Sequence, residues 1–356
     1  MTVASVAIDE LEQPLADQTW RFVAGAITVV SGLVLSLTDR EGRVGYGYTR
    51  VSPPPGTTIA AARARLAELT RALPGRDEAD LNAIMDDLDR RFPGHERLKS
   101  AIECALFDLR AEALGIPLGG LFGGRRRDSI PQMRIIPLKS PEQMAEVGAS
   151  LVQEGYGFLK VKTSGDPDLD VARVRTVRER VGKGIRLMID SNEAYAPDAA
   201  ILALRRMAEH GIELAEQPTP GGDIEGLHRV ARSVPVPVEA DESAQTLPDI
   251  LRLCAGRMVA SINLRILNLG GIRNTLAAVA ICESAGIAYR FGASFGPRLL
   301  QAQTAHVASV VPRLGFAQEL AEFNHILDDP FAGFEVVGGA VEISRAAGSG
   351  VSYKTR

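Results

Sequence analysis

Two lysines lie two positions apart in the apolar segment Phe158-Leu159-Lys160-Val161-Lys162. Side chains of a β-strand alternate between its two faces, so Lys160 and Lys162 should point the same way, about 6 to 7 Å apart. Of the 40 Lys and Arg residues in the chain, only six are Lys, and two of these are here. Burial and a neighbouring cation lower the pKa of a lysine, whereas an arginine stays charged. The pair therefore predicts a general base, although an exposed edge strand is the ordinary interpretation of Lys-x-Lys alone.

Acidic residues follow three successive apolar segments farther along the chain. Asp190 ends the first in Met-Ile-Asp-Ser-Asn, Glu216 ends the second in Leu-Ala-Glu-Gln-Pro, and Asp241 ends the third in Glu-Ala-Asp-Glu-Ser. One acid at a strand end is most simply a helix N-cap. Three buried carboxylates in register repel one another unless a cation neutralises them. Because ligation by oxygen alone favours Mg²⁺, with Mn²⁺ second, the pattern predicts a metal site beside the lysine pair.

The elements that must position these residues alternate between strand and helix from about residue 130 onward. The strand-like segments are Pro131–Pro137, Phe158–Lys162, Ile185–Asp190, Ile212–Glu216, Val236–Asp241, Val259–Leu264 and Ile287–Phe291. Helical patterns such as Asp170–Val181 and Ala196–His210 follow them. A βα repeat of this regularity predicts an α/β fold with a parallel (β/α) barrel, in which all strand ends face one mouth.

The first 128 residues have a different organisation and predict a separate α+β domain. Strand patterns at Ala26–Thr38 and Gly42–Arg50 precede helical patterns at Ile59–Leu73, Glu78–Phe92 and Glu96–Gly115. The glycine-rich segment Leu118–Gly124 and the three arginines after it are interpreted as a linker. We expect residues 129–319 to form the barrel and residues from about 320 to 356 to return to the first domain and complete it.

Composition narrows the class of partner. The 356 residues are 46% hydrophobic and carry a net charge of −4, with a pI near 5.9, so nothing indicates binding to nucleic acid or to a membrane. Cys104, Cys254 and Cys282 are far apart in the sequence and predict neither a metal cluster nor a disulfide framework. No signal peptide and no apolar run long enough to span a bilayer are found, so we expect a cytoplasmic protein.

Together these motifs resemble the enolase superfamily, close to the muconate lactonizing enzyme subgroup of the mandelate racemase/muconate lactonizing enzyme family. Further segments carry the resemblance over nearly the whole chain, namely Ile102–Leu109, Gly115–Leu118, Leu121–Gly124 and the Asn-Leu-Gly-Gly-Ile that follows Arg265. The resemblance implies a modified (β/α)7β barrel with an α+β capping domain formed by the N-terminal part and the C-terminal tail. It also implies a small-molecule carboxylate substrate and a homo-oligomer.

The resemblance assigns a role to each matching residue. It implies Mg²⁺ ligands at Asp190, Glu216 and Asp241, with supporting residues at Asn192 and Glu242. Lys162 would remove the proton α to the substrate carboxylate, and Lys160 would lower the pKa of Lys162 and help hold the enolate. These roles agree with elementary chemistry, because a carboxylate neutralised by a divalent cation has a more acidic α-proton.

Arg265 departs from the pattern, because the subgroup usually has a second lysine at this position. An arginine stays protonated and is a poor proton shuttle, so two-base racemisation is not expected. A reaction on one face needs Lys162 alone as base and can use Arg265 as a fixed cation. We therefore predict a cycloisomerase or a lyase such as a dehydratase, with a racemase or epimerase of an amino-acid derivative as the alternative. The substitution could also mark an impaired enzyme.

The remaining predictions concern specificity and other classes of protein. The seventh strand carries no His, which argues against a base of the mandelate racemase type. Specificity is predicted to come from Trp20, Tyr48, Arg290 and Ser294. Tyr48 also stands where the family commonly has an acid. Two other classes stay open: a barrel aldolase that forms a Schiff base at Lys160 or Lys162, and a non-catalytic paralogue. The sequence does not identify the carboxylate.

Overall fold

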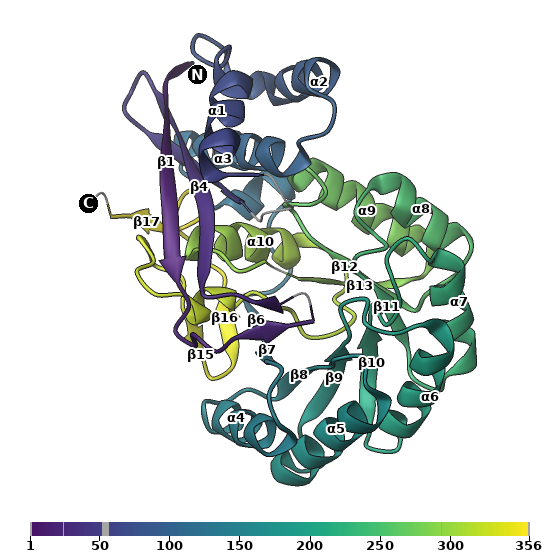
Figure 1. The fold of residues 1–356 in the computed structure, drawn as a ribbon. Helices are drawn as coiled ribbons and strands as arrows, with labels where there is room; N and C mark the ends of the chain where they lie inside the picture. The colour runs from purple at the N-terminus through teal and green to yellow at the C-terminus, as the bar shows by residue number, and fades with distance from the viewer. Residues whose placement is uncertain (1, 24, 52–56, 293, 355–356) are drawn as a thin grey trace.

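The computed structural model describes residues 2–23, 25–51, 57–292 and 294–354. An antiparallel sheet opens the chain, with strands in the order β1 (Val3–Pro14), β4 (Val29–Asp39) and β5 (Val44–Arg50). The helices α1 (Ile59–Thr70), α2 (Leu81–Arg91) and α3 (Glu96–Leu114) cover it. They enclose their own apolar core between sheet and helices. This capping part lies at one end of a larger barrel in Figure 1.

Glycines in β5 let helix α3 pack directly on the sheet. A Cβ at Gly47 would lie 1.9 Å from the carbonyl oxygen of Ala101, and one at Gly45 would lie 2.3 Å from that of Ala105. Neither distance is possible between real atoms, so any larger residue would force the helix away from the strand. The spacing Gly-x-Gly in this strand is therefore explained by close packing.

The barrel contains a parallel sheet of seven strands within the described part of the chain. Its strands are β7 (Met133–Ile136), β8 (Phe158–Lys162), β9 (Arg186–Asp190), β10 (Ile212–Glu216), β11 (Val238–Ala240), β12 (Ser261–Leu264) and β13 (Ala288–Phe291). The helices around it are α4 (Pro141–Gln153), α5 (Pro167–Val181), α6 (Pro197–Ala208), α7 (Ile224–Ser233), α8 (Leu247–Ala255), α9 (Ile272–Ala285) and α10 (Arg298–Val310). Proline in the first turn of α4, α5, α6 and α8 starts these helices, where its missing N–H costs nothing.

An eighth segment occupies the gap between the first and last strands of the barrel. Gln318 pairs in parallel with Gln132, and Glu319 pairs in parallel with Gly292. The Gln318 carbonyl accepts from Met133 at 2.9 Å, and the Glu319 amide donates to Phe291 at 3.0 Å. The predicted α/β barrel with a capping domain is thus confirmed, and its eighth position is held by single bridges on each side.

The C-terminal tail packs against the capping part through short pairings and one buried acid. Asp108 of α3 accepts from the Tyr46 amide at 2.9 Å and from the Ser349 amide at 2.6 Å. Burial raises the pKa of Asp108 to about 6. The short strands and 3-10 helices are β2 (Arg21–Phe22), β3 (Gly25–Ala26), η1 (Glu78–Asp80), η2 (Leu118–Phe122), β6 (Ser129–Pro131), η3 (Glu322–His325), β14 (Phe331–Ala332), β15 (Val336–Val337), β16 (Ala340–Glu342) and β17 (Ser352–Tyr353).

The segment after α3 is not a free linker, contrary to the sequence interpretation. Residues 118–122 form η2, whose Leu118 is buried, and Gly119 lies close to Val310 and His306 of α10. Arg127 donates to the carbonyls of Ala308, Val311 and Pro312. The glycines and arginines therefore dock this segment on the end of α10.

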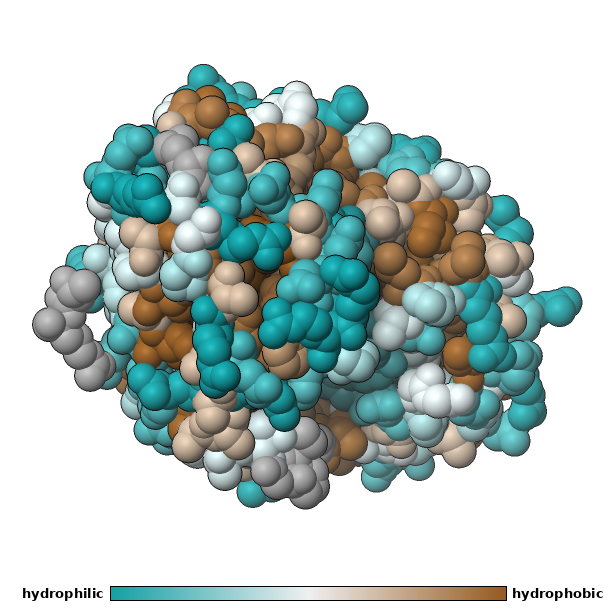
Figure 2. Space-filling view, turned by 90° about the horizontal axis from the view of Figure 1, so that it is seen from above, coloured by the Kyte–Doolittle hydropathy of each residue, from teal (hydrophilic) through white to brown (hydrophobic). Residues whose placement is uncertain are grey.

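Large exposed hydrophobic residues are scattered over the surface. In Figure 2, hydrophobic residues on the face seen are interrupted by hydrophilic ones. The most exposed are Val23, Val29, Leu114, Leu169, Leu202, Leu251, Leu327 and Val337. Across the described residues, no helix has both the length and the apolar character that crossing a bilayer requires.

The three cysteines are buried and free. Cys254 of α8 and Cys282 of α9 nevertheless bring their sulfur atoms to 4.0 Å from each other. This proximity was not predicted from the sequence, because the two cysteines are far apart in the chain. They come close because residues one βα repeat apart lie on neighbouring helices of the barrel.

Candidate active site

The two lysines at the end of β8 point into the barrel, as predicted. Lys160 Nζ lies 3.0 Å from Glu216 Oε2, 3.3 Å from Asp190 Oδ2 and 2.6 Å from Glu319 Oε1. Burial alone would lower the pKa of Lys160, but these three carboxylates outweigh it and hold the pKa above its ordinary value. Lys160 is therefore a fixed cation.

Lys162 lies one step nearer the mouth than Lys160. Its Nζ forms an ion pair with Asp190 Oδ2 and donates to Asn192 Oδ1 at 2.7 Å. It also stands 5.1 Å from the centre of the Phe22 ring, which comes from the capping part. The predicted base thus lies between barrel acids and a capping aromatic, where a substrate carbon can be placed.

Glu216 and Arg290 form the centre of the charge network below the lysines. Arg290 contacts Glu216, lies 2.7 Å from Glu239 Oε2 and 2.8 Å from Glu319 Oε2, and is fully buried. Burial raises the pKa of Glu216, but Arg290 and Lys160 outweigh it and lower the pKa to about 2. Arg290 therefore balances acids under the site, and it does not reach a substrate as its prediction for specificity required.

Arg265 at the end of β12 ion-pairs with Asp241 and lies 3.8 Å from Glu216 Oε1. Burial raises the pKa of Asp241 well above its ordinary value, and the nearby acids Glu242, Glu216 and Asp190 add to this rise against the opposing charge of Arg265. Glu242 accepts from Asn192 Nδ2 at 3.2 Å through Oε1, whereas its Oε2 is buried without a hydrogen bond. The predicted acids and Asn192 thus belong to one interacting cluster.

A cavity of about 240 Å³ opens above this cluster. It is lined by Phe22, Arg50, Ile135, Lys160, Lys162, Asn192, Glu193, Glu242, Arg265, Ser294, Phe295, Glu319 and Glu322. The two predicted lysines, Arg265, both supporting residues and Ser294 are therefore exposed to one space. Phe22 and Arg50 belong to the capping part, so both parts of the chain form the walls.

Trp20 and Tyr48 do not line this cavity. Trp20 packs edge-on against Phe22, Phe295 and His325, and only 3% of it is exposed. Tyr48 is 2% exposed, within a cluster of apolar side chains that includes Leu299. Tyr48 points into the core instead, and Trp20 packs on the Phe22 ring that lies near Lys162.

Several residues of the site were not found from the sequence. Glu239 precedes Asp241 by two positions, so strand alternation places both side chains on the same side of the sheet. This alternation was a signal in the sequence that Glu239 belongs to the site. Glu319 and Glu322 follow a segment with weak strand character. Asn263 donates to Glu216 Oε1 at 2.9 Å from inside β12. Arg50 lies two positions after Tyr48, for which a role in specificity was predicted, and Arg50 rather than Tyr48 lines the cavity.

The predicted ligand acids do not surround a common point. Among the residues that the structure describes, no three Asp, Glu, His or Cys side chains lie close enough to hold an ion as they stand. Ammonium and guanidinium groups contact those oxygens and compensate the charge of the buried carboxylates. The donor set still fits Mg²⁺, since it is buried, contains only oxygen and keeps one Glu242 oxygen without a partner. Asp190, Glu216 and Asp241 are the residues that would hold it.

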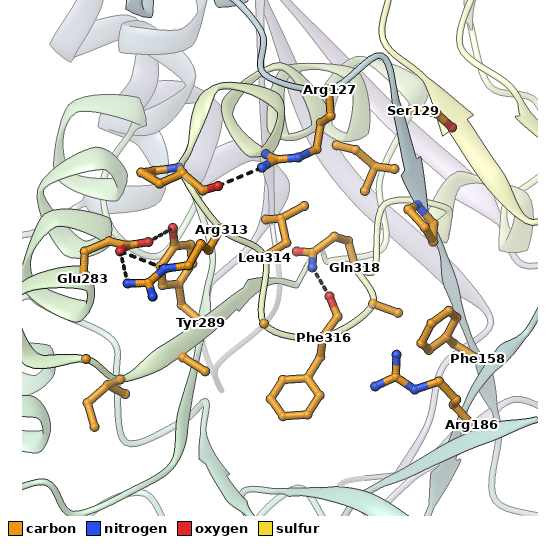
Figure 3. Close-up of a pocket in the computed structure, with 18 residues that line it drawn as sticks. Arg127, Ser129, Phe158, Arg186, Glu283, Tyr289, Arg313, Leu314, Phe316 and Gln318 are labelled. Carbon is orange, nitrogen blue, oxygen red and sulfur yellow. Dashed lines mark hydrogen bonds and ion pairs between the residues drawn. The ribbon is translucent and has the colours of Figure 1, made fainter.

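Two larger cavities lie away from this cluster. One, of about 740 Å³, lies at the opposite end of the barrel, where β8 starts at Phe158 and β9 starts at Arg186. In Figure 3, two of its charged groups are paired: Arg313 with Glu283, and Arg127 with a backbone carbonyl. The other, of about 770 Å³, lies beside the first turns of α1 and α3. Arg50 lines this second cavity as well as the one above the acids.

Comparison with known proteins gives consistent relatives. The family described as mandelate racemase/muconate lactonizing enzyme, N-terminal domain, matches residues 15–123, and the family described as enolase C-terminal domain-like matches residues 143–356. The L-Ala-D/L-Glu epimerase of Clostridium acetobutylicum is 31% identical over 313 residues, which is 87% of each chain. Muconate cycloisomerase 1 of Rhodococcus opacus is 31% identical over 326 residues, or 90% of this chain and 87% of that one.

A solved structure agrees over nearly the full length. The dipeptide epimerase from Enterococcus faecalis V583, complexed with Mg and the dipeptide L-Leu-L-Tyr, has a TM-score of 0.93 at 28% identity. It covers 99% of this chain and 100% of the other. By these matches, the chain belongs to the mandelate racemase/muconate lactonizing enzyme family and is an enolase-superfamily enzyme of the muconate lactonizing enzyme-like subgroup.

Proposed function

We propose that the protein is a magnesium-dependent enzyme that removes the proton α to a substrate carboxylate, with Lys162 as the base. The observation that carries the proposal is the position of Lys162 Nζ on the cavity wall, 2.7 Å from Asn192 Oδ1 and beside Asp190. A cavity that faces both a lysine and a cluster of acids suits a substrate whose carboxylate and α-carbon must be held together. The relatives support this class of chemistry.

The residues divide the work by charge. Mg²⁺ held by Asp190, Glu216 and Asp241 would neutralise the substrate carboxylate and make its α-proton more acidic. Lys162, when neutral, takes that proton on Nζ, while the electron pair of the C–H bond moves toward the carboxylate. Lys160 stays charged and stabilises the negative charge that develops there. Arg290 holds Glu216 and Glu319 in place below.

Arg265 determines which reactions follow. Its guanidinium is paired with Asp241 and keeps its charge, since the neighbouring acids raise its pKa further against the effect of burial. It therefore provides no group that readily accepts or releases a proton on the second face of the substrate. A reaction confined to the Lys162 face, such as cycloisomerisation or β-elimination, needs no such group.

Epimerisation is the second candidate, and the names of the relatives favour it. Proteins called L-Ala-D/L-Glu epimerase are among the most similar curated relatives, alongside a muconate cycloisomerase. An epimerase must return a proton to the face opposite the one from which it was taken. Arg265 would then have to deliver that proton, which its high pKa opposes.

Exchange of the α-proton with deuterium in D₂O tests the proposal. The panel is L-Ala-L-Glu, L-Leu-L-Tyr and muconolactone with Mg²⁺, followed by NMR. We expect exchange that chelation stops and that Lys162→Ala lowers at least about 100-fold, while calorimetry shows Mg²⁺ binding to both proteins. A covalent adduct trapped by borohydride would indicate the aldolase instead. Absence of both exchange and Mg²⁺ binding would indicate a non-catalytic paralogue.

A further inference from the structure

Arg50 is a cation without a partner on the wall of the active-site cavity. It ends β5, and within the described chain its guanidinium makes no hydrogen bond and no ion pair. Its guanidinium lies 5.8 Å from the centre of the Phe295 ring. Burial lowers the pKa of Arg50; Tyr48 opposes this effect, and the like charges of Arg97 and Arg265 add to it. An isolated, partly buried charge of this kind is costly for the folded protein.

The other cations of the cavity each have an acid. Lys160 contacts three carboxylates, Lys162 contacts Asp190, and Arg265 contacts Asp241. Among the described lining residues, Arg50 is thus the cation that no carboxylate neutralises. Residues 52–56, Ser-Pro-Pro-Pro-Gly, contain no acidic side chain that could do so.

Arg265 contributes a second hydrogen-bond donor without an acceptor to the same cavity. Its Nε is buried and has no hydrogen-bond partner, although another nitrogen of the same guanidinium contacts Asp241. Arg50 and Arg265 come from different parts of the chain, the capping sheet and the barrel. Two guanidinium groups that line one cavity and keep donors without partners suit the binding of a carboxylate, because each offers planar N–H groups.

We propose that Arg50, together with Arg265, binds a second carboxylate of the substrate, so that the enzyme prefers dicarboxylates. The inference rests on the proposed function, in which the first carboxylate lies beside Lys162 and the acids of β9 to β11. Glu322, an acid of the same lining, forms no ion pair with Arg50, and its oxygens lie 3.9 Å from Arg134 and 3.4 Å from His325. The substrate would thus span the cavity between the barrel and the capping part.

Ligands of the same length but different charge separate the effect of charge on binding from the effect of size. Succinate, glutarate and adipate are titrated against their monoamides, which have the same length and one negative charge less, in saturating Mg²⁺. Binding is followed by calorimetry and by the fluorescence of Trp20, the single tryptophan, which packs on Phe22 and Phe295 of the cavity wall. We expect the best dicarboxylate to bind at least about 10-fold more tightly than its monoamide, as expected for a charge-assisted pair.

Variants assign that preference to Arg50. Arg50→Gln should abolish the preference, and Arg50→Lys should keep part of it. Arg97→Gln is the matched control, because Arg97 lies nearby but donates to Asn268 and does not line the cavity. If Arg97→Gln removes the preference as fully as Arg50→Gln, the preference comes from the overall positive charge of this region. The proposal that Arg50 forms a carboxylate subsite would then be wrong. Without ligand, Arg50→Gln should melt at a higher temperature than the wild type, whereas loss of a structural contact would lower it.

The outcomes also separate this inference from the proposed function. Equal binding of dicarboxylates and monoamides, with Mg²⁺-dependent exchange intact, overturns the second subsite alone. Absence of exchange with every acid overturns the catalytic proposal, and a preference that depends on Arg50 would still support an anion subsite. If 3-phosphonopropionate binds more tightly than succinate and Arg50→Gln removes that advantage, the subsite is for phosphorus oxyanions and the carboxylate assignment is wrong.

Discussion

At the scale of single residues, this site is distinguished by arginine where its family commonly uses lysine. Arg265 stays charged beside Asp241, whereas a lysine there could lose its proton and act as a second base. Lys160 is likewise a fixed cation, because three carboxylates surround it. Lys162 is therefore the one side chain at the mouth to which the proposed chemistry assigns proton transfer.

Arg265→Lys tests this assignment directly. The wild type should exchange the α-proton with retention of configuration, because the proton leaves and returns on the Lys162 face. With lysine at 265, epimer should appear at least about 10-fold faster than in the wild type, since a second proton-transfer group becomes available. Chiral chromatography of the deuterated product measures both rates. Arg265→Gln is the control that cannot carry a proton, and rapid inversion by the wild type would contradict the one-base mechanism.

At the scale of elements, the ends of strands position the chemistry and close packing of α3 holds the capping sheet. Strands β8 to β12 deliver Lys160, Lys162, Asp190, Glu216, Asp241 and Arg265 to one mouth because parallel strands all end at the same rim. β5 delivers Arg50 from above, and its orientation depends on the contact between Gly47 and α3. The capping element is thus part of the site.

Gly47→Ala should destabilise the protein because the new methyl group would overlap the Ala101 carbonyl. We expect a loss of roughly 1–3 kcal/mol in the free energy of unfolding, or more if α3 cannot shift. Gly184→Ala is the control, since nothing lies within 4 Å of a Cβ at that position. Urea denaturation followed by circular dichroism measures both. Equal stability of the two variants would show that α3 does not depend on this contact.

At the scale of the whole molecule, the tail joins the barrel to the capping part. His306 of α10 is 2% exposed and its Nε2 lies 3.3 Å from the carbonyl oxygen of Ser349. The Ser349 amide in turn donates to Asp108 of α3. Helix, tail and capping part therefore share one buried polar junction, and its protonation affects the stability of the entire chain.

Acid should remove the contribution of His306 to this junction, whereas protonation of Asp108, whose pKa burial raises to about 6, acts in the opposite direction. Burial lowers the pKa of His306 from about 6.5 to about 4, against a smaller opposing effect of the Ser349 carbonyl. The unfolded chain then binds the proton more tightly than the folded one, so this contribution to stability is full above pH 6.5 and falls toward pH 4. The loss at pH 4 is about 3 kcal/mol for a shift of this size. Urea titrations of the wild type and His306→Gln at several pH values measure it, and parallel pH profiles would contradict the prediction.

Much of the fold followed from local pattern. Apolar segments with acids at their ends predicted the strands of the barrel to within a few residues, because burial on both faces leaves a continuous hydrophobic run. β1 was missed, since this 12-residue edge strand is largely exposed and shows no regular alternation. The predicted linker was wrong at residues 118–127, where glycines permit docking on α10.

The sequence by itself determined the barrel, the lysine pair, the three acids and the replacement at Arg265, because residue type and strand period are local properties. Only the tertiary structure decided that Arg290 lies beneath the acids, that Tyr48 and Trp20 pack away from the cavity, and that Arg50 and Arg265 line the same cavity. These facts depend on how the capping sheet sits over the barrel mouth. Contacts between residues more than 200 positions apart set that placement, and no local pattern encodes them.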